Sequence, residues 1–389
     1  MQQFDIILVV GFFRRLTSYL SIIKYLVKDK KIGLFPIPLE GSLKSKHKST
    51  QEEFIRTCVD MGGQVIANGT ASAKIAIFPQ EPYLKEAFER IHENLMASRK
   101  IGMLTLAWVG IHDAFIEELD INKVFVVHRA FFDFLLRHRG DPKIFEKREI
   151  VEVGLPYKKY PIFQDFQADY LMAIPTPFSF SREKDKWDFL ETVLSLFQKI
   201  DHRETIVYKP HNAQDRDYFS DFKYRRLAHY LRLLPDKMVR LSLKGLAGGG
   251  STSAGNRFGR LYSAFLYERI MDRVIPIENL TAHHHLAMEA FLPGVNKGII
   301  GGLSNTMWGA LFFELPFYNC VDIEVQDRER EDKLYNKDSS QLLDLNLRFF
   351  HVPYCRGELE FDRKYFDIVD DSTRQGDLIY EIKKELSQV

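Results

Sequence analysis

A lysine and a histidine near the middle of the chain have the types and the spacing that bind a phosphate. They lie in Tyr208-Lys209-Pro210-His211-Asn212, at the end of a short apolar run that is typical of a buried strand. Lys209 would supply a point charge and His211 a directional hydrogen-bond donor. Pro210 fixes the backbone so that the histidine projects from the strand end. We therefore expect Lys209 and His211 to contact a phosphate group.

A carboxylate follows a second expected strand, Asp272–Pro276. Glu278 could accept hydrogen bonds from both hydroxyls of a ribose, as an acidic residue does in dinucleotide-binding folds. It could equally cap a helix that begins near Thr281. The sequence leaves both roles open for this residue.

A turn rich in hydroxyl and amide groups follows a third apolar run, Gly298–Gly301. Ser304, Asn305 and Thr306 stand between this run and a helical stretch, Met307–Phe313. The N–H groups at the start of a helix bind anions, and side chains of these types also cap helices. Three such residues in succession favour contact with a phosphate, so we assign this turn to the same site.

The first half of the chain offers fewer polar groups after its expected strands. Gly11 and Arg14 follow the first apolar run, where they could bind an anion or a hydroxyl group or form a plain turn before a helix. Catalysis by proton transfer or by nucleophilic attack needs a side chain such as a carboxylate or a histidine. Asp113, His112 and Glu40 each follow an expected strand and are the candidates, with Asp113 the first choice. Solvation or helix capping would explain each of them as well.

The run His283-His284-His285 is not expected to hold a metal. Consecutive residues of a helix point about 100° apart, so three of them cannot share one ion. Neither an HExxH motif nor a matching carboxylate pair accompanies them. We interpret these histidines as the surface of a helix, Thr281–Phe291, and expect no metal site.

The elements that must position these motifs repeat along the chain. Short apolar runs alternate with helix-length segments, which is typical of βαβ units and a parallel sheet. The alternation stops near residue 155 and restarts near residue 168, so we expect an α/β protein of two Rossmann-like domains, 1–155 and 168–389, facing a central cleft. Ligands in such folds bind beyond the carboxyl ends of the strands. The C-terminal tail is expected to pack back on the first domain.

Individual elements are expected as follows. The strands are Phe4–Val10, Lys31–Ile37, Gln64–Asn68, Lys74–Phe78, Ile101–Ala107, Lys123–His128, Tyr170–Ile174, Glu204–Lys209, Val239–Leu243, Asp272–Pro276, Gly298–Gly301 and Pro316–Cys320. The helices are Thr17–Lys28, Thr50–Met61, Glu81–Ala97, Lys184–Ile200, Arg225–Leu234, Thr281–Phe291 and Met307–Phe313. The low-complexity segment Ala247–Asn256 is interpreted as a mobile loop.

Composition excludes several classes of protein. The chain has 389 residues, 45% of them hydrophobic and 28% charged, which excludes a disordered chain. Its net charge of +1 argues against a nucleic-acid binder, which usually carries a basic excess. Three widely spaced cysteines suit a reducing compartment, and no apolar run reaches the length of about 18 residues that spans a bilayer. We expect a cytoplasmic protein.

The order Lys-x-His, then Pro-x-Glu, then a Ser-containing turn before a helix resembles bacterial transferases that use CMP-sialic acid or CMP-Kdo. Their fold is GT-B, two Rossmann-like domains around a cleft. The resemblance implies that Lys209, His211 and Ser304–Thr306 hold the donor phosphate and that Glu278 holds the ribose. It implies a metal-independent glycosyltransferase without a cofactor, whose co-substrate is a CMP-sugar and whose acceptor is a glycan or glycolipid of lipopolysaccharide or capsule.

Three other interpretations share parts of this pattern. The string Tyr208-Lys209-Pro210-His211 also resembles the Lys-Pro-His-Pro of glycerophosphotransferases that use CDP-glycerol. A UDP-sugar epimerase of GT-B-like fold would place similar groups on its nucleotide. A non-catalytic binding module could keep the scaffold without the reaction.

Two segments of the first half could contact an anionic glycolipid or a membrane surface. Leu43–Ser49 reads LKSKHKS and is basic, and Phe131–Arg139 mixes aromatic with basic residues. A solvated loop and a core helix are the competing interpretations. Peripheral contact with the inner membrane would suit a lipid-linked acceptor.

Overall fold

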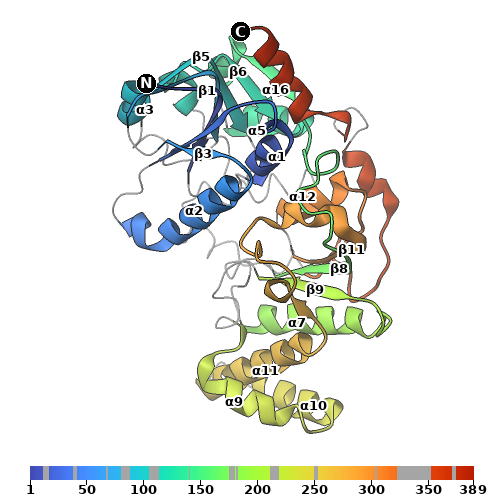
Figure 1. The fold of residues 1–389 in the computed structure, drawn as a ribbon. Coiled ribbons are helices and arrows are strands. Elements are labelled where there is room, and N and C mark those ends of the chain that lie inside the picture. The colour runs from blue at the N-terminus through green and yellow to red at the C-terminus, as the bar shows by residue number, and fades with distance from the viewer. Residues whose placement is uncertain are drawn as a thin grey trace. The chain divides into compact units, whose positions relative to one another are not determined.

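The chain folds into two compact units. The structure, a computed structural model, describes residues 1–11, 17–37, 42–66, 69–79, 88–104, 114–139, 141–174, 180, 183–210, 219–248, 253–302, 305–321, 352–369 and 374–389. The first unit consists of Met1–Asp165, His283–Pro293 and Phe366–Val389. The second consists of Phe166–Ala282 and Gly294–Tyr365 (Figure 1). Each unit therefore contains segments that lie far apart in the sequence.

The first unit is built on a parallel sheet of seven strands in the order β3-β2-β1-β4-β5-β6-β7. Its strands are β1 (Gln2–Val10), β2 (Ile32–Pro36), β3 (Gln64–Val65), β4 (Ala71–Pro79), β5 (Leu95–Leu104), β6 (Lys123–Val126) and β7 (Glu149–Glu152). Its helices are α1 (Thr17–Leu26), α2 (Ser42–Asp60), α3 (Phe88–Asn94), α4 (Ala114–Glu118), α5 (Arg129–Arg139), α6 (Pro142–Glu146) and α16 (Leu378–Ser387). The order of the first six strands is that of a doubly wound Rossmann sheet.

The C-terminal helix α16 is anchored to the first unit by polar side chains that are partly or fully buried. Asp377 caps it by accepting the backbone N–H of Tyr380 at 2.9 Å, and it also accepts the Tyr160 hydroxyl at 2.8 Å. Glu385 of α16 is fully buried and pairs with Lys123 at the start of β6. Helix packing and these bonds hold the end of the chain against this unit.

The second unit repeats the plan with five parallel strands in the order β10-β9-β8-β11-β12. These strands are β8 (Ala168–Ala173), β9 (Ile206–Lys209), β10 (Ile275–Pro276), β11 (Val295–Gly301) and β12 (Phe317–Asn319). The helices are α7 (Glu183–Phe197), α9 (Phe222–Leu231), α10 (Asp236–Gly248), α11 (Ser253–Met271) and α12 (Asn305–Phe312), with a 3₁₀ turn at Ile277–Asn279. The 3₁₀ turn Met288–Ala290 belongs to the first unit. The predicted α/β class with two Rossmann-like sheets is confirmed, and the cleft stays a prediction.

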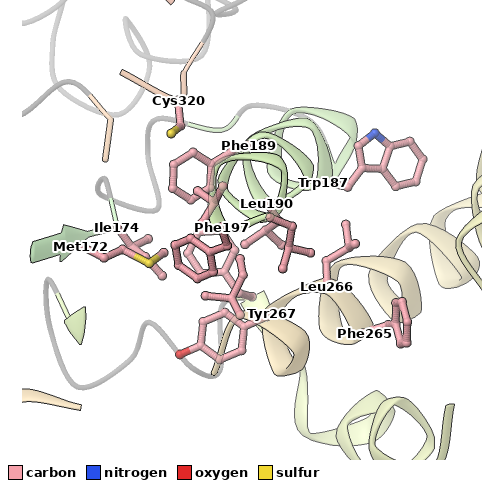
Figure 2. Packing of buried hydrophobic residues seen from close by; sticks show 14 of the residues in the cluster. Met172, Ile174, Trp187, Phe189, Leu190, Phe197, Phe265, Leu266, Tyr267 and Cys320 are labelled. Atoms are coloured by element: carbon pink, nitrogen blue, oxygen red, sulfur yellow. The ribbon is translucent and has the colours of Figure 1, made fainter. Parts of the chain in front are cut away.

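Helix α7 forms the centre of the second core. Figure 2 shows Leu190 and Phe197 of this helix among the side chains of β8 and α11, including Met172 and Tyr267. All four are buried, which removes a large apolar area from water and stabilises the unit. This packing holds the sheet beneath the helices that cover it.

Two expected elements are helical where other structures were predicted. The predicted strand Val239–Leu243 lies within α10, where Val239, Leu243 and Ala247 recur every four residues and are buried. The segment Ala247–Asn256 is not wholly a loop, because α10 continues to Gly248 and α11 begins at Ser253. Burial of every fourth residue, which is close to the period of a helix, distinguishes this helix from a strand.

One expected helix is replaced in part and another entirely. Residues 95–97 belong to strand β5, which pairs with β4 from Leu95 onward, so sheet pairing overrides local helical preference. The predicted helix Thr281–Phe291 is wrong, since this segment forms turns and a 3₁₀ turn. Its rings pack within the first unit instead, with Phe163 stacked on His283 at 5.2 Å and on Phe291 at 5.0 Å. Strand β7 was not predicted.

None of the helices in the described ranges combines the length and the apolar character needed to cross a membrane.

Candidate functional site

The strands of the second sheet end at one level. Ala173, the last residue of β8, lies beside Lys209, the last residue of β9. On its other side Ala173 pairs with Gly301, the last residue of β11, which in turn pairs with Asn319 of β12. Pro276 of β10 pairs with Tyr208, one residue before this level. The segments predicted to hold a nucleotide therefore all leave the same edge of the sheet.

This edge contains the switch point of the sheet. Chain order reverses between β8 and β11, and ligands of doubly wound sheets bind beyond the strand ends at that position. Lys209 and Gly301 flank β8 on its two sides. Since neighbouring strands lie about 4.8 Å apart, their backbones are separated by about 10 Å. A phosphate-bearing ligand can reach groups on both strands across this distance.

Lys209 is only 5% exposed at this edge. Lysine is seldom buried to this degree unless polar groups surround its ammonium group. It follows three apolar residues that are buried in the sheet, Ile206, Val207 and Tyr208. The strand thus places a cation at the carboxyl edge, as the sequence predicts.

Gly301 permits a close approach of the two central strands. A β-carbon added to this glycine would lie 2.6 Å from the carbonyl oxygen of Ala173. Real β-carbons do not approach a backbone oxygen this closely, so any other residue would push β11 away from β8. The glycine therefore has a structural reason at the switch point, independent of any ligand.

Glu278 lies two residues beyond β10, in the 3₁₀ turn Ile277–Asn279, and its side chain is exposed. No α-helix begins at Thr281 within residues 253–302, so the interpretation of Glu278 as the cap of that helix is wrong. The turn is closed by a backbone bond from Leu280 N–H to the Ile277 oxygen at 2.9 Å. The exposed Glu278 carboxylate is therefore accessible from solvent at this edge.

Helix α12 is the first described element after β11. Asn305 and Thr306 are the first two residues of this helix, and the structure describes their backbone alone. The expected helix Met307–Phe313 is thus confirmed with an earlier start. Ser304 and His211 lie outside the described residues.

Strand β12 ends at a buried asparagine, Asn319, whose side-chain hydrogen bonds were not predicted from the sequence. The Asn319 side chain donates from Nδ2 to the Val352 oxygen at 3.3 Å and accepts from Val321 N–H at 3.1 Å. Beside it, the sulfurs of Cys320 and Cys355 are 3.9 Å apart. Burial raises the pKa of the Cys320 thiol, and its hydrogen bond to Cys355 lowers the pKa of the latter. The contacts of Asn319 with Val352 and of Cys320 with Cys355 join residues more than 30 positions apart, so no local sequence pattern predicts them.

Of the first-unit residues that the sequence predicted for binding or catalysis, Gly11 lies within the described residues. It is buried directly after β1. The Gln51 amide of α2 donates to the carbonyl oxygens of Val10 at 3.1 Å and of Ile37 at 2.9 Å. The ends of β1 and β2 are therefore tied together by the protein itself. Arg14, Glu40, His112 and Asp113 lie outside the described residues.

His128, which lies two residues after the end of β6, has a structural role. Its Nδ1 accepts the backbone N–H of Phe131 at 2.9 Å, and its Nε2 lies 3.3 Å from the Ile368 oxygen. A nitrogen that accepts an N–H is unprotonated, so the ring is neutral with its proton on Nε2.

The three consecutive histidines lie in turns of the first unit, so their placement on a helix is wrong. His285 Nε2 lies 3.2 Å from the Thr57 hydroxyl, and His283 stacks on Phe163. Among the residues that the structure describes, no group of three His, Cys, Asp or Glu side chains could hold a metal ion.

Comparisons with known proteins give distant structural likenesses. No family model matches the chain, and neither does any curated protein. It is similar to a UDP-GlcNAc 2-epimerase from Methanocaldococcus jannaschii in complex with UDP-GlcNAc and UDP, with a TM-score of 0.42, 8% identity and coverage of 98% of this chain and 99% of that chain.

Two further solved structures resemble it at a similar level. A protein from Listeria monocytogenes described as a UDP-N-acetylglucosamine 2-epimerase has a TM-score of 0.41 and 11% identity, with 100% of this chain and 95% of that chain covered. A UDP-glucosyltransferase from Polygonum tinctorium has a TM-score of 0.38 and 9% identity, with coverage of 98% and 99%. Likenesses this distant assign no family and no activity.

Proposed function

We propose that the protein is a nucleotide-sugar enzyme whose second unit binds the nucleotide at the carboxyl edge of its sheet. The shared level of Lys209, Ala173 and Gly301 carries this proposal, because it brings a cation, a helix start and an acidic residue to one edge. Groups of these types bind the phosphate and the ribose of a nucleotide. This part of the proposal concerns the second unit alone.

The finer part of the proposal names the reaction. The enzyme is a glycosyltransferase that moves a 2-keto sugar acid of the Kdo or sialic acid type from a CMP donor to a glycan or glycolipid. The bond between the anomeric carbon and the phosphate oxygen breaks as the acceptor oxygen attacks. Lys209, His211 and the Ser304–Thr306 turn would stabilise the charge that develops on the departing phosphate, and Glu278 would hold the ribose.

The acceptor proton goes to a base of the first unit. Asp113 is the first candidate, and His112 and Glu40 are the alternatives. Attack by the acceptor alone inverts the configuration of the sugar. Retention by double displacement would need a carboxylate nucleophile in the same place.

The proposal is tested by incubating the full chain with CMP-Kdo, CMP-sialic acid, CDP-glycerol and UDP-GlcNAc and following nucleotide release and sugar products. CMP release from a keto-sugar donor, lost in Lys209→Gln, supports the transferase. An isomerised sugar from UDP-GlcNAc would replace it with an epimerase, and CMP release from CDP-glycerol alone with a glycerophosphotransferase. Neither turnover nor nucleotide binding would leave a binding module and overturn the proposed site.

A further inference from the structure

The helices α9 and α10 expose an unusual concentration of apolar side chains. Half of the large hydrophobic side chains that are exposed in the described chain lie between Phe222 and Leu246. Phe222 and Leu233 are each 80% exposed, and Leu241 of α10 is 67% exposed. Single exposed leucines are ordinary, but a cluster of this kind marks an interaction site. We refer to the exposed face of residues 222–246 as the α9–α10 surface.

The exposure follows from how the two helices pack. Both lie against α11, which buries Tyr262, Phe265 and Leu266 in the core of the second unit (Figures 1 and 2). Helix α10 turns Val239 and Leu243 toward the core, with both side chains buried. Helix α9 packs Ala228, Tyr224 and Leu231 against the same core. The exposed apolar side chains of the two helices therefore lie outside the core of this unit.

The same surface is strongly basic. Residues 222–248 contain seven Lys and Arg against a single Asp, in a chain whose net charge is only +1. Arg232, Arg240 and Lys244 pair with Asp272, Asp236 and Glu191. Within the described part of the chain, the side chains of Lys223, Arg226 and Lys237 have no acidic partner and are exposed. Apolar side chains beside unpaired cations are the pattern of a helix that lies in a membrane interface.

We propose that the α9–α10 surface docks the protein on an anionic phospholipid membrane. Leucine, phenylalanine and methionine side chains would enter the boundary between headgroups and acyl chains. Lys223, Arg226 and Lys237 would meet the lipid phosphates, each adding to the attraction. A second copy of the chain fits less well, because two surfaces with the same strong positive charge repel each other. The proposal is independent of the nucleotide site.

The test is flotation of the full chain with vesicles of phosphatidylcholine alone and of phosphatidylcholine with one-third phosphatidylglycerol. We expect binding to the anionic vesicles only, weakened by salt. The double variant Leu233→Glu with Leu241→Glu should lose at least tenfold in binding. The triple variant Lys223→Gln, Arg226→Gln and Lys237→Gln should lose about a hundredfold, at about fivefold per cation.

The matched control places the same two carboxylates on exposed apolar residues of the first unit. Met96→Glu with Tyr380→Glu should bind vesicles like the unmodified protein, since these residues are 51% and 60% exposed outside the α9–α10 surface. Circular dichroism verifies that every variant is folded. Absence of binding to anionic vesicles, or equal loss in the control, would overturn the proposal. Self-association that the leucine variant abolishes, without vesicle binding, would assign the surface to a second copy and overturn it too.

Discussion

Lys209 and Gly301 end two strands that flank β8 at the level of Ala173. One residue supplies a buried cation, and the other supplies the space that lets the central strands meet. Their shared level makes the carboxyl edge of the second sheet a site at which separate motifs converge. The consequences for stability and binding can be measured separately.

The close approach at Gly301 predicts a large cost for a single methyl group. Gly301→Ala would place a β-carbon 2.6 Å from a backbone oxygen, and we expect a loss of about 1–3 kcal/mol in the free energy of unfolding. Gly245→Ala is the matched control, because this helical glycine has nothing within 4 Å of the added carbon. It should stabilise the protein by up to about 1 kcal/mol. Urea unfolding followed by circular dichroism compares the two, and equal effects would contradict the account.

The buried pair between Lys123 and Glu385 predicts that the C-terminal helix is essential to the first unit. Lys123 is 5% exposed and Glu385 is fully buried, so Glu385→Gln leaves a buried cation with only the exposed Glu149 at 2.8 Å. We expect a loss of about 3 kcal/mol, the low end for breaking a buried pair. Asp133→Asn, which breaks a pair with Arg129 between side chains that are 43% and 47% exposed on α5, should cost less than about 0.5 kcal/mol. Denaturant titration distinguishes these values, and a small effect of Glu385→Gln would refute the prediction.

The Tyr160 hydroxyl predicts a pH dependence of the first unit. Burial and the hydrogen bonds to Asp377 raise the pKa of Tyr160 to about 12. Since the folded state holds this proton more tightly than the unfolded state, the contribution is complete below about pH 10. It is lost as the pH rises toward 12. Tyr160→Phe should flatten this part of the curve of stability against pH, whereas Tyr380→Phe, on the exposed face of α16, should not. Parallel curves for Tyr160→Phe and the unmodified protein would contradict it.

The two neighbouring thiols predict an order of reactivity. The hydrogen bond from Cys320 lowers the pKa of Cys355, whereas burial raises the pKa of Cys58 and of Cys320. Because the thiolate is the nucleophile, Cys355 should be alkylated first, and at lower pH than an ordinary thiol. Cys320→Ala should shift the alkylation profile of Cys355 to higher pH, because the hydrogen bond that lowers its pKa is lost. Mass spectrometry of bimane-labelled protein gives the order, and faster labelling of Cys58 would sink the idea.

Much of the scaffold was predictable because its strands are short, buried and apolar on both faces. Strand β9, for example, was predicted from Ile206, Val207 and Tyr208. Lys209, which follows them, lies at the edge where it was expected. Helix α9 was predicted as Arg225–Leu234, but α10 was not, since Val239 and Leu243 alone suit a strand or a helix. The seven cations and the recurrence of Val239, Leu243 and Ala247 were the signal that could have found it.

The parts of the candidate site that depend on register were beyond the sequence. That Gly301 faces the carbonyl of Ala173 follows from strand pairing across more than 120 positions. Likewise the contact between Cys320 and Cys355 depends on how the segment around Tyr354 returns to β12. The capping role considered for Glu278 failed because His283 and Phe291 pack in the first unit instead of forming a helix.

The most direct test of the nucleotide site is a calorimetric titration of the full chain with CMP, UDP, GDP and ADP. We predict selective binding of CMP, weakened at least tenfold in Lys209→Gln and in His211→Ala. Lys297→Gln is the control, because Lys297 lies near the opposite end of the same sheet, where it pairs with Glu204 and Asp169. It should leave the affinity unchanged. Binding of no nucleotide, or equal affinity in all three variants, would contradict a phosphate site at the carboxyl edge of the second sheet.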